Sequence, residues 1–171
     1  MKNPIHQDQK NAMKPFRQRF EIRWSDLDAN RHVANSAYVN FMSHTRMAYL
    51  ISHGFDHHDM EKFRIGPVLF YEHIYYHREV LPGQTIDVTL WLKGLSKDGM
   101  FFEFGHEIFG IDGTHHLSAE IMGGFIDLDT RKLTPLADDQ IRQIFDNLKR
   151  TPDFRWLTRE DTRKGPMAQR G

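Results

Sequence analysis

The residues best suited to chemistry lie in one polar stretch, Asp26 to Tyr38, which reads D-L-D-A-N-R-H-V-A-N-S-A-Y. Two carboxylates, an imidazole and two amides fall within its first ten residues, directly before a predicted helix. The free N–H groups and partial positive charge of a helix N-terminus stabilise an oxyanion. A carboxylate held beside such donors can attack a carbonyl carbon or take a proton from water.

Three other interpretations of this stretch need no catalysis. Asp and Asn are common in turns and helix caps, so the polar residues could serve the fold alone. A calcium-binding loop is the second, because Asp26, Asp28 and Asn30 match its first three ligand positions. Arg31 then stands where such a loop needs glycine, and Ala37 where it needs a bidentate glutamate. The third is a solvated surface histidine at position 32.

The flanking patterns indicate which elements position the stretch. Residues 16–24 alternate between apolar and polar, which predicts a strand with Trp24 on its buried face. Apolar side chains at helical spacing predict a helix over residues 36–52, with Asn35 as its N-cap and Gly54 at its end.

Long strands are expected after this helix, at residues 68–79, 85–93, 100–111 and 115–128. Aspartate–glycine pairs predict hairpin turns before the last two of them. An amphipathic helix follows near residues 137–150. The predicted fold class is α+β, with a long central helix wrapped by a curved antiparallel sheet of about five strands and a C-terminal amphipathic helix.

Composition narrows the class of protein. The chain has 171 residues, 23 basic and 23 acidic, so it lacks the basic excess of nucleic-acid-binding proteins. No cysteine is present, and no apolar run is long enough to span a membrane or act as a secretory signal. We expect a flexible N-terminal tail at 1–15, one domain at 16–150, a C-terminal tail at 151–171, and a cytoplasmic location.

The eleven histidines do not indicate a metal site. His73 and His77 have the spacing of helical zinc ligands, but their neighbours favour a strand. Their side chains would then lie about 13 Å apart, too far to share one ion. We therefore expect packing or interface roles for these two histidines, and no metal and no cofactor.

The stretch S-D-L-D-A-N-R-H-V-A-N-S-A-Y resembles the S-D-L-D-x-N-x-H-V-N-N-x-x-Y motif of the hotdog-fold thioesterases. It is especially similar to acyl-ACP thioesterases and to the 4-hydroxybenzoyl-CoA thioesterase group, and the likeness covers roughly residues 16–135. The resemblance implies a single hotdog domain in which Asp28 is the catalytic carboxylate. It also implicates Asn30 and His32 and, as donor to the thioester carbonyl, the backbone amide of Asn35.

Two substrate-binding residues are further candidates, Tyr38 and Arg31. Arg31 replaces a glycine that the group often carries before the histidine, and could narrow the pocket or meet a phosphate. Ala34 replaces the first asparagine of the usual pair.

The resemblance implies hydrolysis of an acyl-CoA or acyl-ACP thioester, by a homodimer or a dimer of dimers whose active sites lie between subunits. Three alternatives stay open. One is a hotdog enoyl-thioester hydratase, although its D-x-N-P-x-H motif has a proline and one residue more than this chain. The others are a non-catalytic module that binds acyl groups and an interaction protein that has kept only the fold.

Overall fold

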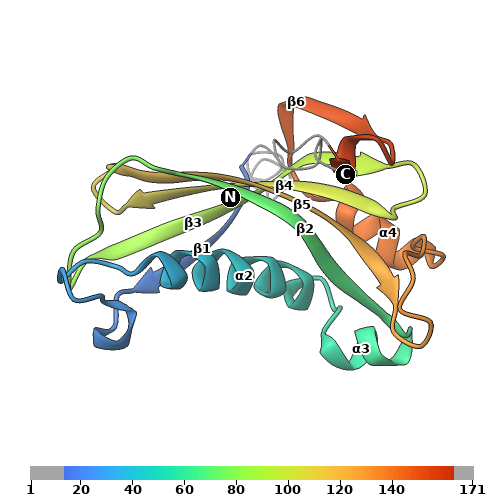
Figure 1. Ribbon diagram of the computed structural model, residues 1–171, viewed down its shortest axis with the longest axis horizontal. Coiled ribbons are helices and arrows are strands. Elements are labelled where there is room, and N and C mark those ends of the chain that lie inside the picture. Colours follow the sequence, from blue (N-terminus) through green and yellow to red (C-terminus); the bar gives the residue numbers. More distant parts are fainter. Residues whose placement is uncertain (1–13, 164–171) are drawn as a thin grey trace, which may run out of the picture.

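A computed structural model describes residues 14–163 of the chain. It has an α+β architecture in which one sheet carries its helices on one side and at one end (Figure 1). The helices are α2 (Asn35–Ser52), α3 (His57–Lys62) and α4 (Asp139–Asp146), with short 3-10 turns at Trp24–Asp26 and Asp161–Arg163. The strands are β1 (Phe16–Glu21), β2 (Ile65–Tyr76), β3 (Thr85–Ser96), β4 (Phe101–Gly110), β5 (His115–Asp127) and β6 (Arg150–Leu157).

The sheet has six strands where about five were predicted. Its order is β1-β3-β4-β5-β2 with every neighbouring pair antiparallel, while β6 pairs with β3 in parallel. The additional strand, β6, lies almost entirely within the segment expected as a C-terminal tail, and its last residue, Leu157, is buried. The expected N-terminal tail falls outside the described residues except for 14 and 15.

Helix α2 lies along one face of the sheet (Figure 1). Its first half buries Ala37, Phe41 and Met42 in a core cluster with side chains of β3, β4 and β5. Its second half buries Tyr49 and Leu50 in another cluster, which also holds buried side chains of α4. Burying each large apolar side chain contributes roughly 1.5–3 kcal/mol, so both ends of α2 are fixed relative to the sheet.

Two local predictions are wrong. Strand β1 ends at Glu21, and Trp24 starts a 3-10 turn with its side chain 90% exposed rather than on the buried face. Asn35 is the first residue of α2, whereas Ala34 occupies the N-cap position and makes no side-chain capping bond. The described helices include none with the length and apolarity that crossing a membrane requires.

Candidate active site

The polar stretch forms a tight turn between β1 and α2. Leu27 and Val33 form an isolated antiparallel bridge across its base, and the Asp28 N–H donates to the His32 carbonyl at 2.9 Å. The Arg31 N–H donates back to the Asp28 carbonyl at 3.1 Å. Arg31 has φ of 66°, in the left-handed region that glycine adopts without strain. The turn therefore has a defined shape, which sets the positions of residues 28 and 32.

The two carboxylates of the motif have different environments. Asp26 is buried and accepts hydrogen bonds from the backbone N–H and the guanidinium of Arg23, at 2.8 to 3.2 Å. Burial alone would raise the pKa of Asp26, but the hydrogen bonds and charge of Arg23 outweigh it and the pKa is lowered. Asp26 is thus a paired, structural carboxylate, and Asp28 is the one that can meet a ligand.

Asp28 presents one oxygen to the turn and the other to His32. Its Oδ1 accepts the Asn30 N–H at 2.8 Å, and its Oδ2 lies 3.4 Å from His32 Nδ1. Both side chains are 31% exposed, so solvent and ligands can reach them. Asn30 helps to orient the carboxylate through its backbone, while its own side chain is exposed.

The start of α2 supplies a free donor. The Asn35 side chain accepts the Ser36 N–H at 2.9 Å, which satisfies one amide of the first turn. The backbone N–H of Asn35 itself has no acceptor among residues 14–163. An unsatisfied N–H at a helix N-terminus is suited to receive a carbonyl oxygen that becomes negative during reaction.

These groups meet in a groove with a volume of about 360 Å³. Four of the six predicted site residues line it, namely Asp28, His32, Asn35 and Tyr38, whereas Asn30 and Arg31 are not among its lining residues. Tyr38 is buried, and burial raises the pKa of its hydroxyl, so the side chain is neutral near pH 7.

The opposite wall of the groove comes from residues 76–79, at and just after the end of β2. Tyr76 meets Tyr38 edge-on, with ring centroids 5.6 Å apart. The next three lining residues are His77, Arg78 and Glu79. The sequence motif does not predict this wall, because no local pattern couples residues 76–79 to residues 28–38.

Backbone hydrogen bonds hold this second wall in place. The Val33 N–H donates to the Val80 carbonyl at 2.9 Å, joining the motif directly to the segment after β2. The N–H groups of His77 and Arg78 both donate to the His116 carbonyl, at 2.8 and 3.2 Å. Within residues 14–163, no group of three or more His, Asp or Glu side chains is arranged to hold a metal ion.

Comparison with known sequences decides the family. A model of the thioesterase-like superfamily matches residues 22–144, most of the chain and the whole of the groove. The chain belongs to the thioesterase-like superfamily. Membership confirms the enzyme class predicted from the motif, a thioester hydrolase, and the resemblance to hotdog-fold thioesterases. A search of curated proteins gives no match.

Solved structures share the fold. The protein SAV2348 of Staphylococcus aureus, solved in complex with CoA, has a TM-score of 0.71 at 21% identity over 85% of this chain and 90% of its own. The DHNA-CoA thioesterase of the same organism has a TM-score of 0.70 at 20% identity over 76% and 87%. The 1,4-dihydroxy-2-naphthoyl-CoA thioesterase Slr0204 of Synechocystis has a TM-score of 0.69 at 16% identity over 78% and 96%.

Proposed function

We propose that this superfamily member hydrolyses an acyl-CoA thioester in the groove at the start of α2, with Asp28 as the catalytic carboxylate. The observation that carries the proposal is the meeting of three groups in one groove: the accessible Asp28 carboxylate, the His32 ring beside it and the start of α2. The start of α2 contributes the backbone N–H of Asn35, which has no acceptor among residues 14–163.

Each group has a role in the proposed reaction. The thioester oxygen accepts the Asn35 N–H, which stabilises the oxyanion; losing such a donor typically costs about 2.7–4 kcal/mol in the barrier. Asp28 takes a proton from the attacking water or attacks the carbonyl carbon itself. In the first path water adds to the carbonyl carbon, the carbon–sulfur bond breaks, and Asp28 returns its proton to the leaving thiolate. In the second path the carbon–sulfur bond breaks as Asp28 forms a mixed anhydride, the thiolate takes a proton from solvent, and water then hydrolyses the anhydride. Both paths leave the free acid and the thiol. His32 orients the carboxylate.

Coenzyme A is the carrier that we favour over acyl carrier protein. Several similar structures are those of CoA thioesterases, and SAV2348 was solved with CoA bound. Arg78 lines the groove and Arg31 lies beside it in the turn, and both carry exposed positive charges. The phosphates of CoA could meet these charges. We keep Arg31 and Tyr38 as proposed substrate contacts, Tyr38 through its ring in the groove wall.

We further propose that two copies associate through β2. This strand ends the strand order and has β5 as its only neighbour in the described sheet. It exposes Leu69, Phe70, Tyr75 and Tyr76, each by more than a third. An unpaired, apolar edge is a template for strand pairing. Because Tyr76 also lines the groove, a second copy on this edge would border the active site.

The direct test is a panel of acyl-CoA thioesters with a thiol-detecting reagent. We expect free thiol to appear with saturated acyl chains or aryl groups. Loss of enoyl absorbance from crotonyl-CoA without thiol release would instead indicate a hydratase. Ligand-induced thermal stabilisation with neither reaction would indicate a binding module. Sedimentation should give a species of at least twice the 20.2 kDa chain mass, and a purely monomeric protein would contradict the proposed β2 interface.

A further inference from the structure

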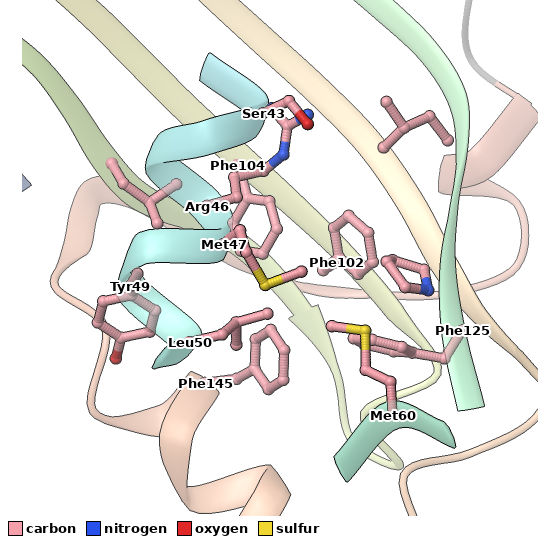
Figure 2. Close-up of a pocket in the computed structure, with 13 residues that line it drawn as sticks. Ser43, Arg46, Met47, Tyr49, Leu50, Met60, Phe102, Phe104, Phe125 and Phe145 are labelled. Atoms are coloured by element: carbon pink, nitrogen blue, oxygen red, sulfur yellow. The ribbon is translucent and has the colours of Figure 1, made fainter. Parts of the chain in front are cut away.

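A second pocket lies under the C-terminal half of α2, and its lining shares no residue with the groove of Asp28 (Figure 2). Its volume is about 220 Å³, and its walls come from α2, α3, α4 and the sheet. The walls are predominantly apolar and are rich in methionine and phenylalanine, including Met47, Met60, Phe102, Phe104, Phe125 and Phe145. Such a pocket suits a hydrocarbon body.

One charged side chain lines this pocket, Arg46 of α2. Figure 2 shows Arg46 and Ser43 at one end, with Met60 and Phe145 at the other. The pocket therefore has a polar end and an apolar end. This polarity is the pattern that an amphiphilic ligand would match.

The neighbour of Arg46 does not balance its charge. Its Nη1 lies 3.2 Å from Nε2 of His106, whose Nδ1 lies 2.8 Å from the Thr89 carbonyl oxygen. A carbonyl only accepts, so Nδ1 carries the proton and Nε2 accepts from Arg46. His106 is fully buried, and burial lowers its pKa to about 3, which makes it neutral near pH 7.

No carboxylate oxygen of residues 14–163 lies within 4.0 Å of an Arg46 nitrogen. Burial lowers the pKa of Arg46 to about 10, so the guanidinium stays charged near pH 7. The negative charge of Glu72 on β2 opposes this shift, but Glu72 makes no hydrogen bond or ion pair with Arg46. A guanidinium has five N–H donors, and His106 receives one. A mostly buried cation with no carboxylate in contact among residues 14–163 is costly, and an anionic ligand in contact with it would lower that cost.

We propose that this pocket binds a small apolar monocarboxylate, with its carboxylate on the Arg46 guanidinium and its hydrocarbon body at the end lined by Met60 and Phe145. A cavity of about 150 Å³ accommodates benzene, so this one suits a ligand of roughly ten non-hydrogen atoms, such as octanoate. Thioester hydrolysis releases acids of this class, and that link to the product rests on the proposed function. The binding itself does not depend on it.

The test is isothermal titration calorimetry of the full chain with octanoate, octan-1-ol and octylamine, which share a chain and differ in charge. Octanoate should bind at least about tenfold more tightly than the alcohol, and the amine should bind most weakly. Equal affinity for octanoate and octanol, or no binding of octanoate, would overturn the proposal.

Three variants make the test specific. Arg46→Gln should weaken octanoate about tenfold or more and leave octanol unchanged. Glu72→Gln should strengthen octanoate, because it removes a competing negative charge near Arg46. Arg159→Gln, which removes an exposed charge elsewhere, should change neither affinity. If the Arg46 variant fails to fold, an unchanged or weakened octanoate affinity of Glu72→Gln still contradicts the proposal.

Asp28→Asn separates this site from the proposed reaction. It should bind octanoate as the unchanged chain does, even if hydrolysis is lost or was never present. Loss of octanoate binding in this variant would place the acid in the Asp28 groove and overturn the second site. A last outcome is that octanoate does not bind and that Arg46→Gln turns dimers into monomers. A carboxylate of a second copy would then be the partner of Arg46, and the proposal would be wrong.

Discussion

His32 Nδ1 lies 3.4 Å from Asp28 Oδ2, across the turn that leads into α2. This separation is longer than a good hydrogen bond and short enough for electrostatic contact. Contacts between catalytic groups are often long without substrate and tighten when it binds. The other Asp28 oxygen is fixed by the Asn30 N–H, so the carboxylate has one anchored and one accessible oxygen.

His32→Gln should lower kcat and leave KM for an acyl-CoA largely unchanged. In the proposed reaction the His32 ring positions Asp28 and does not bind the acyl group, and a misplacement of about 1 Å can cost of the order of 10²-fold in rate. Steady-state kinetics with the best acyl-CoA substrate of the panel measures kcat and KM separately. A raised KM with an unchanged kcat would show instead that His32 binds substrate.

Arg31→Gly should stabilise the fold and weaken binding of the CoA carrier. Arg31 has φ of 66°, and relief of left-handed strain in a non-glycine residue, less the entropy cost of glycine, gives roughly 0.5–1 kcal/mol in the free energy of unfolding. KM should rise for acyl-CoA and stay constant for the matching acyl-pantetheine, which lacks the nucleotide phosphates. If both KM values stay the same, Arg31 does not meet a phosphate.

The sequence predicts one half of the groove well. Residues 28, 32, 35 and 38 belong to one turn and the helix that it starts, so their proximity follows from local structure. The long strands are also predicted within a few residues, because alternation and aspartate–glycine turns are local signals. The position of Arg31 at positive φ is less evident, since only the frequent glycine at that place in related motifs points to it.

The rest of the groove depends on long-range pairing. Residues 76–79 reach it because β2 pairs with β5 at the far edge of the sheet and Val80 bonds to Val33. Strand β6 also depends on long-range pairing, because it pairs in parallel with β3 after the chain has passed through α4. His116 of β5, whose carbonyl accepts the N–H groups of His77 and Arg78, is buried as well. None of these pairings leaves a local pattern.

Stability should fall with acidification through His106. Its pKa is about 3 in the folded chain, and the unfolded value is about 6.5, so between these values only the unfolded state binds the proton. The contribution of neutral His106 to the free energy of unfolding is therefore fully present above about pH 6.5 and is lost as pH falls. The loss is about 1.4 kcal/mol between about pH 7.5 and about pH 5.5. Urea unfolding at these two pH values measures the difference in the free energy of unfolding.

His106→Gln is the control for this titration. A glutamine can donate to the Thr89 carbonyl and accept from Arg46, as the neutral histidine does. The variant should lose less free energy of unfolding than the unchanged chain over the same pH interval. An identical loss in both proteins would assign the pH dependence to other groups.

Gly123→Ala should destabilise the sheet at β5, between β4 and β2. A Cβ at this position would lie 2.5 Å from the Val68 carbonyl oxygen and from Phe102 Cζ, so backbone and core would have to shift. Overpacking of this kind costs about 1–3 kcal/mol in the free energy of unfolding. Gly105→Ala is the matched change, because its Cβ would meet the flexible Lys93 side chain at 3.3 Å. Equal losses in urea unfolding would contradict the assigned contacts.

The most direct test of the account is kcat/KM of Asp28→Asn for the best acyl-CoA substrate, beside Asp139→Asn, which removes an exposed carboxylate on α4. The asparagine oxygen can still accept the Asn30 N–H, so the turn and the melting temperature should be retained. A catalytic carboxylate contributes about 10²–10⁴-fold, so Asp28→Asn should lose at least that factor while Asp139→Asn keeps full activity. Thiol release by Asp28→Asn at the rate of the unchanged chain would contradict the account.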